Sequence, residues 1–160
     1  MSKKNIIILV VAVIVVALAV VAAVIFIKPE ANVQGTLEEI MEKVYAGVAD
    51  EEKPMMLMNM EVTEENAEAF LGTADVKYKE ALVSESAVGS IAHSVVLVRC
   101  ENAKEAEAAA ETIKANANPR KWICVTADVV KVERKGDLVI LIMSNSTLAP
   151  KLEANFGGLV

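Results

Sequence analysis

The sequence predicts an α+β fold, a two-layer domain with a three- or four-stranded mixed sheet packed by helices, preceded by one transmembrane helix. Residues 5–27 contain no charge, glycine or proline. Behind them, segments with helical spacing of apolar residues at 37–47 and 103–117 are interspersed with strand-like apolar runs at 94–100 and 137–144. Strands and helices in this order are typical of one α+β domain.

The amino-terminal apolar segment is long enough to cross a bilayer. As a helix, residues 5–27 span about 34 Å, against a hydrocarbon core of about 30 Å. A cleaved signal peptide is the alternative, because Lys3 and Lys4 form a basic n-region and residues 17–19 read Ala-Leu-Ala. The apolar run continues for eight residues beyond that site and closes at Lys28, which favours an uncleaved anchor.

The charges that flank this segment predict its orientation. Two lysines precede it, whereas one lysine follows it before Glu30, so we expect the amino terminus to stay in the cytoplasm. The predicted organisation is a cytoplasmic tail (1–4), a transmembrane helix (5–27), a linker (28–35) and an extracytoplasmic α+β domain (36–160). We thus expect a single-pass protein of the cell membrane that contacts lipid through residues 5–27.

The charge of the remaining chain limits its partners. The 160 residues include 16 basic and 22 acidic ones. Without Lys3, Lys4 and Lys28, 13 basic residues face 22 acidic ones, a net charge of −9. This balance argues against nucleic acid as a partner, because nucleic acid binding requires clusters of lysine and arginine.

The first half of the domain is predicted to contain two helices and one strand. Thr36 and Glu39 form a capping box for a helix that ends near Gly47. A shorter helix is expected between Thr63 and Gly72, followed by a strand at 78–86. The apolar stripe of the first helix consists of Leu37, Ile40, Met41, Val44, Tyr45 and Val48.

The second half is predicted to contain three strands and one helix. Residues 94–100 are apolar on both faces, as expected of an interior strand. Asn102 caps the helix at 103–117. Strands at 122–133 and 137–144 are joined around Lys135 and Gly136, a strong hairpin signal.

Two cysteines in an outward-facing domain raise the question of a disulfide between Cys100 and Cys124. The helix at 103–117 returns the chain to the opposite end of the sheet, so the two sulfurs are expected at opposite ends. A disulfide requires Cα atoms within about 7 Å. Buried free thiols are therefore the preferred interpretation, with the disulfide as the alternative.

The sequence predicts no catalytic, cofactor-binding or metal-binding residue. The one histidine, His93, is expected partly exposed at the start of a strand and on the face opposite to Cys100. A pair of His93 with Cys124 has no motif behind it. The carboxylate pairs at 51–52 and 64–65 point apart and are expected in solvent. No P-loop, GxGxxG, GxSxG or HExxH motif occurs.

Four methionines gather in six residues, at positions 55, 56, 58 and 60. Thioethers in an exported protein are suitable ligands for copper(I). Alternation in an extended segment also places Met56, Met58 and Met60 on one face, where methionine commonly fills gaps in a core. The core interpretation is preferred to the copper site.

Several segments together resemble an uncharacterised family of clostridia-type bacteria, domain of unknown function 4358. They are residues 53–56, 90–98, the alanine-rich helix, 118–124 and 136–139. The resemblance covers about Thr36 to Ser144 and implies an extracytoplasmic domain tethered to the membrane. Members often begin as lipoproteins, and this chain lacks the lipid-acceptor cysteine. The family has no established activity, so it implies no site residue.

The sequence therefore predicts a membrane-anchored extracytoplasmic binding or interaction module of the bacterial cell envelope, non-enzymatic, with an envelope protein as its partner. The absence of a cluster of titratable groups and of glycine-rich loops favours this interpretation. The alternatives are an envelope-acting enzyme of unknown class and methionine-based copper(I) binding.

Overall fold

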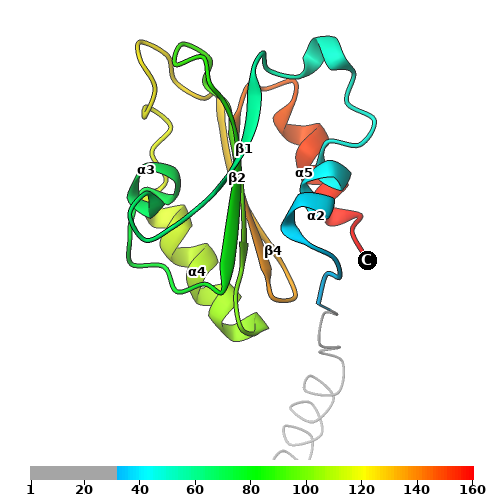
Figure 1. The fold of residues 1–160 in the computed structure, drawn as a ribbon, viewed down its shortest axis with the longest axis vertical. Helices are drawn as coiled ribbons and strands as arrows, with labels where there is room; N and C mark the ends of the chain where they lie inside the picture. The colour runs from blue at the N-terminus through cyan, green and yellow to red at the C-terminus, as the bar shows by residue number, and fades with distance from the viewer. Residues whose placement is uncertain (1–31) are drawn as a thin grey trace, which may run out of the picture. The chain divides into compact units, whose positions relative to one another are not determined.

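The structure is a computed structural model that describes residues 32–160. In this part of the chain, a five-stranded sheet lies between two layers of helices (Figure 1). The predicted cytoplasmic tail, the transmembrane helix and the first residues of the linker lie outside the described residues. Among residues 32–160, no helix has the length and apolar character that a membrane span requires.

The described elements follow one another along the chain, and the longest connection, residues 117–128, joins α4 to β4. They are α2 (Leu37–Val44), the 3-10 helix η1 (Asp50–Glu52), β1 (Leu57–Glu61), α3 (Ala67–Leu71), β2 (Glu80–Ser86), β3 (Ser94–Arg99), α4 (Ala103–Asn116), β4 (Val129–Lys135), β5 (Leu138–Ser144) and α5 (Ala149–Gly157). The α+β class is confirmed.

All neighbouring strands are antiparallel, in the order β1-β2-β3-β5-β4. The predicted mixed sheet of three or four strands is therefore wrong in two respects. Helix α4 does connect β3 to a strand of the same direction, but the hairpin inserts β5 between β3 and β4, so no parallel pair forms. The additional strand is β1, which comes from the methionine-rich stretch.

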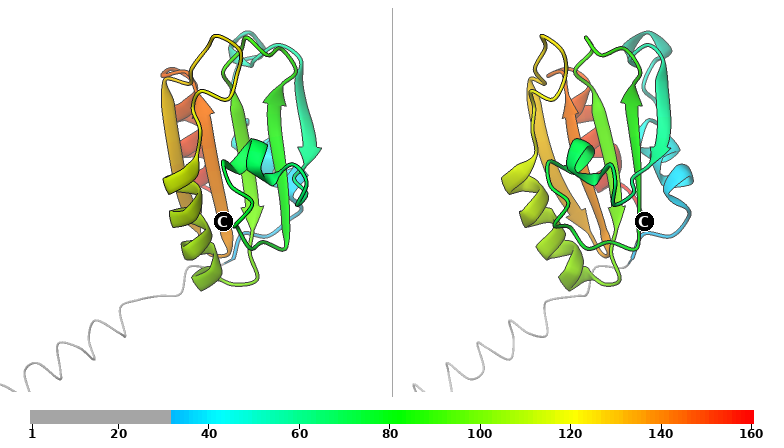
Figure 2. Two further views of the ribbon diagram at one scale, coloured as in Figure 1. Left: turned by 90° about the vertical axis from the view of Figure 1, so that its left-hand side faces the viewer. Right: turned by 60° about the vertical axis from the view of Figure 1, so that its left-hand side comes forward.

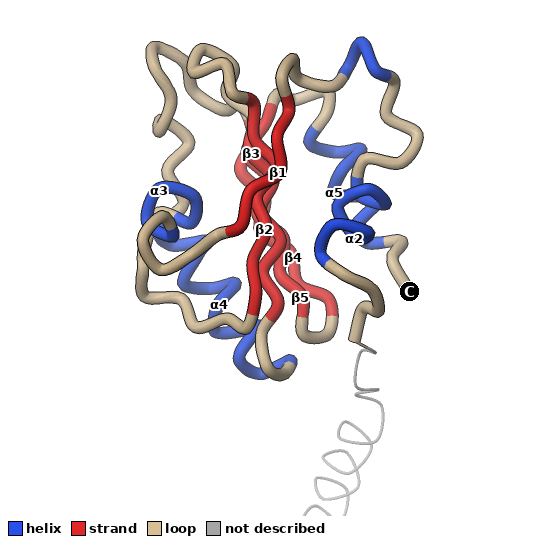
Figure 3. The backbone as a smooth tube through the Cα atoms, in the orientation of Figure 1, coloured by secondary structure: helices blue, strands red, loops and turns tan. Residues whose placement is uncertain are grey.

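Helices cover both faces of the sheet, so the predicted two layers are three (Figure 3). On one face, called here the α2/α5 face, helices α2 and α5 pack on Leu82, Val95, Leu97, Ile140 and Ile142. On the other, the α3/α4 face, helices α3 and α4 pack on Val83, Val96, Val98, Leu141 and Met143. The strands β3 and β5 are buried on both faces, as their continuous apolar sequences predict.

Helix α5 is the element that sequence reasoning missed. Its spacing was readable, since Leu148, Ala149, Leu152 and Phe156 are all buried at helical intervals. Asn145 opens it by accepting hydrogen bonds from the N–H groups of Thr147 and Leu148, at 3.0 and 2.8 Å. This helix supplies half of the second helical layer.

The predicted start signals of two helices are confirmed. The Thr36 hydroxyl accepts from the Glu39 N–H at 3.2 Å, and the Glu39 carboxylate accepts from the Thr36 N–H at 3.1 Å. Asn102 caps α4 by accepting from the Glu105 N–H at 3.0 Å. The six residues predicted for the apolar stripe of the first helix are all buried, but α2 ends at Val44 rather than near Gly47, so Tyr45 and Val48 follow the helix.

Two further segments differ from the prediction. Residues 122–128 form a loop, and the strand expected there begins only at Val129, because Cys124 has a left-handed φ of 61° that no regular strand adopts. Val33, expected in the linker, is buried in the core. Arg99 holds this segment by donating to the carbonyls of Val33 and Gly35, at 3.2 and 2.9 Å.

Candidate functional site

Strand β1 forms one edge of the sheet and pairs only with β2 within the described chain. Backbone bonds from Ala87 to Met56 and from Val62 to Ala81 flank its ladder. Because the register between them is unbroken, the even-numbered residues of β1 exchange bonds with β2, and the odd-numbered ones point away. The N–H and C=O groups of Leu57 and Asn59 therefore face the open edge.

The methionines of this region lie in solvent. Met55 is 68% exposed, Met56 66%, Met58 50% and Met60 39%. The core interpretation of these residues is therefore wrong. The reason is the position of β1 at the edge of the sheet. On the α3/α4 face, α4 packs on β4 and β5 and α3 packs on β3, and no described helix covers β1 (Figure 2).

A polar cluster lies beside the methionines on the α3/α4 face. Glu85, which is paired with Met58 across the strands, accepts from Lys121 at 2.7 Å and from the Trp122 indole at 2.9 Å. The Lys121 ammonium also lies 4.8 Å from the centre of the Phe70 ring. Desolvation lowers the pKa of Lys121, against the opposing effect of Glu85. This cluster holds the loop at 120–123 against β2 and leaves the methionines uncovered.

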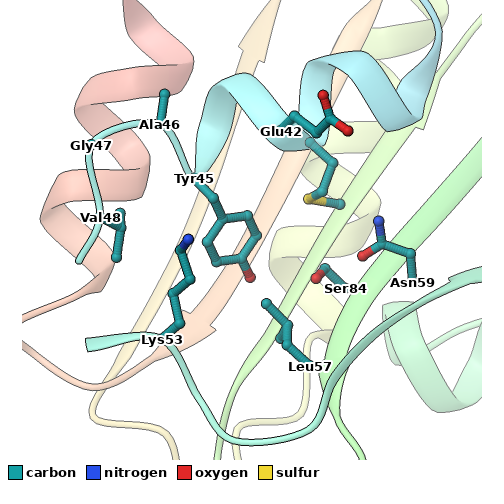
Figure 4. Close-up of a pocket in the computed structure, with 10 residues that line it drawn as sticks. Glu42, Tyr45, Ala46, Gly47, Val48, Lys53, Leu57, Asn59 and Ser84 are labelled. Atoms are coloured by element: carbon teal, nitrogen blue, oxygen red, sulfur yellow. The ribbon is translucent and has the colours of Figure 1, made fainter. Parts of the chain in front are cut away.

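The other side of β1 lines a pocket of about 400 Å³ between α2 and the strand (Figure 4). Tyr45, Lys53, Leu57, Asn59 and Ser84 lie around it in the close-up view. The pocket combines apolar walls with an ammonium, a carboxamide, hydroxyl groups and the carboxylate of Glu42. It is open along the same edge that exposes the backbone of β1.

The hydroxyl of Ser84 is the polar group at the base of this pocket. Its side chain is buried, and Oγ has no hydrogen-bond partner of good geometry in the described chain, although it lies near the Tyr45 hydroxyl and opposes the rise in the pKa of that group. Buried hydroxyls normally have a partner. The Ser84 hydroxyl thus lies buried at the wall of the pocket, beside the hydroxyl of Tyr45.

His93 lies behind this pocket, buried with 1% of its surface exposed. The expectation of a partly exposed histidine is wrong. Its Nε2 is hydrogen bonded to the Tyr45 hydroxyl at 2.6 Å and its Nδ1 to the Ser144 hydroxyl at 2.8 Å. The three residues link α2, the start of β3 and the end of β5.

Burial sets the protonation state of this network. It lowers the pKa of His93 to about 4, and it raises the pKa of Tyr45. A neutral imidazole has one donor and one acceptor nitrogen, and both are used here. The network joins three elements, with Tyr45 at the wall of the pocket beside α2 and His93 at the wall of a second pocket of about 290 Å³ that Glu52 and Asp128 also line.

The two cysteines are free, as preferred from the sequence. Cys100 is buried at the end of β3, where desolvation raises its pKa to about 11. Cys124 is exposed, contrary to expectation, in the loop that precedes β4. Sequence reasoning placed it inside because it assigned residues 122–128 to a strand.

Carboxylates flank β1 on both sides. Glu51 precedes the strand, and Glu61, Glu64, Glu65 and Glu68 end or follow it; all five are exposed and form no ion pair within the described residues. Glu52, by contrast, accepts from Lys151 at 2.6 Å. No group of three histidine, cysteine or acidic side chains in residues 32–160 is arranged to hold a metal ion.

Comparison of the chain with protein-family models, curated proteins and solved structures gave no match. What defines this molecule is therefore its own geometry, an α+β domain with one open, methionine-bearing sheet edge. The resemblance to domain of unknown function 4358 stays a prediction.

Proposed function

We propose that this protein is a single-pass, membrane-anchored interaction module of the bacterial cell envelope, non-enzymatic, whose β1 edge binds an envelope protein. The observation that carries the proposal is the open edge of β1 itself. Natural sheets protect their edges with charges, prolines, bulges or covering segments. Between Leu57 and Glu61 the chain has none of these except the terminal carboxylate.

The opposite edge of the sheet gives the comparison within the molecule. Strand β4 carries Lys131, Glu133, Arg134 and Lys135, and Lys131 forms an ion pair with Glu153 of α5 at 3.2 Å. One edge of the same sheet is thus protected and the other is open. This asymmetry favours binding at β1 over a passive edge.

The second proposal considered, an envelope-acting enzyme, has less support. Its best chemical group is the linked set of His93, Tyr45 and Ser144. That set has no acidic member among its hydrogen-bonded partners and is largely buried, although Tyr45 lines the pocket beside α2 and His93 lines a second pocket with Glu52 and Asp128. The exposed carboxylates around β1 do not converge with it.

Site-specific photo-crosslinking in living cells tests the proposal. A photoreactive amino acid replaces Met58 in one variant of the full chain and Val130 in another. Both positions are exposed, at 50% and 38%, on opposite edge strands. We expect a discrete crosslinked protein from position 58 and none from position 130. Equal, diffuse patterns from both positions would contradict the proposal.

The exposure of four thioethers also supports a third candidate function, copper(I) binding by Met55, Met56, Met58 and Met60. The double variant M58L/M60L separates the two candidates, because leucine keeps the apolar surface and removes sulfur. An interaction module keeps its crosslinked partner in this variant. A copper site loses copper(I) retention by at least about tenfold, measured by competition with a copper(I) chelator.

A further inference from the structure

We propose that the ligand of the β1 edge is an extended, basic segment of a partner protein, added to the sheet as a sixth strand. The segment has an alternating, β-forming centre and lysine or arginine on both sides of it. This inference rests on the proposed function and specifies what the edge recognises. Three independent features of β1 lead to it.

The first feature is the backbone. The N–H and C=O groups of Leu57 and Asn59 point away from β2, and so does the N–H of Glu61. The Glu61 carbonyl is already occupied, since it accepts from the Asn66 carboxamide at 3.1 Å. Successive outward groups at this spacing match one extended strand, and main-chain bonds of this kind supply affinity in β-strand addition.

The second feature is the different surface on each side of the strand. A sixth strand points alternate side chains to opposite faces of the sheet. One set would lie at the pocket beside α2, near Leu57 and Asn59 (Figure 4). The other set would lie beside Met58 and Met60, whose flexible side chains adapt to varied shapes. Both halves of an alternating segment therefore meet a surface.

The third feature is charge, and it selects the occupant. Residues 50–68 contain seven acidic residues and one basic residue, and they flank β1 at both of its ends. A second copy of this chain paired through β1 would bring two such acidic sets together, which is unfavourable. A segment with basic ends meets complementary charge instead. Glu51 supplies it at the start of β1, where Asp50 and Glu52 already form ion pairs with lysines, and Glu61, Glu64, Glu65 and Glu68 supply it at the end of the strand.

Titration with synthetic peptides tests the inference on the purified full-length protein in detergent. The probe is a peptide of nine residues. It has two lysines at each end and five alternating valine and threonine residues between them. We expect saturable binding by fluorescence anisotropy that weakens as salt rises. The same peptide with glutamate in place of lysine should bind at least about tenfold more weakly.

Backbone methylation distinguishes strand addition from adhesion by charge. Methylation of every central amide nitrogen removes the N–H donors of both strand edges and places methyl groups against β1, so it should abolish binding. Methylation of every second amide leaves one edge intact and should retain it. Equal binding of the unmethylated and the fully methylated peptides would overturn strand addition.

Two pairs of protein variants supply matched controls. N59P removes an outward-facing N–H without breaking a bond to β2, whereas N59A removes the same side chain and keeps that N–H. We expect at least about a tenfold loss for N59P relative to N59A. E61K/E64K should lose the preference for lysine ends, whereas E107K/E111K, on the exposed side of α4, should keep it.

The possible failures are distinguishable. If position 58 crosslinks a partner in cells and the lysine peptide does not bind, the interaction stands and the strand inference fails. If light scattering shows a dimer that N59P dissociates, the occupant is a second copy, which overturns the basic-segment inference. Circular dichroism confirms that each variant is folded before binding is measured.

Discussion

At the residue scale, His93 shows how an unremarkable sequence position becomes a structural centre. Its ring bonds to Tyr45 from α2 and to Ser144 from β5. Nothing near it in the sequence indicates these contacts, because both partners are about fifty residues away. The cap residues Thr36 and Asn102, whose partners lie three residues on, were predicted correctly.

The lowered pKa of His93 makes the stability of the domain depend on pH. Its pKa is about 4 in the folded protein against 6.5 as the ordinary value, so the unfolded state binds a proton first as the pH falls. The contribution is complete above pH 6.5 and is lost toward pH 4. We expect a loss of about 2 to 3 kcal/mol between pH 7 and 4.5.

The variant H93Q isolates this contribution, because glutamine does not titrate. Urea unfolding, followed by the fluorescence of the single tryptophan, gives the free energy of unfolding of both proteins at each pH. The difference between wild type and H93Q should shift by about 2 to 3 kcal/mol in favour of the variant as the pH falls. A constant difference across this range would contradict the assignment.

At the element scale, local sequence patterns predicted the interior strands and the capped helices correctly. They failed where the burial of a segment depends on its position in the sheet. The strands at 94–100 and 137–144 are buried on both faces, which their sequences show directly. The methionine-rich stretch was expected to be buried because alternation cannot distinguish a central strand from an edge. The open side of β1 follows from where the helices lie, which no local pattern records.

Gly72 ends α3 and gives a test of helix packing. It has a left-handed φ of 82°, and a Cβ atom there would overlap the backbone carbonyl of Asn116 at the end of α4. Gly47, after α2, has a similar φ of 71° but open space around it. We expect G47A to cost about 1 kcal/mol of unfolding free energy and G72A at least about twice as much.

Chemical denaturation of the two variants checks this prediction. Both carry the same backbone strain, so the additional loss in G72A measures the contact between α3 and α4. Equal losses in the two variants would show that the two helix ends separate at little cost.

At the scale of the whole molecule, the sequence was sufficient for the α+β class, but not for the number of layers. The third layer depends on α5, whose helical spacing after Ser144 is short and includes Pro150. The strand order also needed the structure, because the hairpin at Gly136 is compatible with β5 on either side of β4.

The proposed outward orientation can be tested with the exposed thiol of Cys124. A membrane-impermeant maleimide applied to intact bacterial cells should label the wild type and C100S, and should not label C124S. The buried Cys100 gives no signal in any folded variant. Labelling that appears only after lysis would place the domain in the cytoplasm and contradict the proposed location.

Amide hydrogen exchange of the full-length protein, with and without the lysine-ended peptide, tests the central claim most directly. The proposed strand addition predicts that binding slows exchange at Leu57, Asn59 and Glu61, whose N–H groups face the open edge, and leaves Met58 and Met60 unchanged, since they already bond to β2. The protected edge strand β4 should also stay unchanged. Protection spread evenly along β1, or confined to another part of the molecule, would contradict the account.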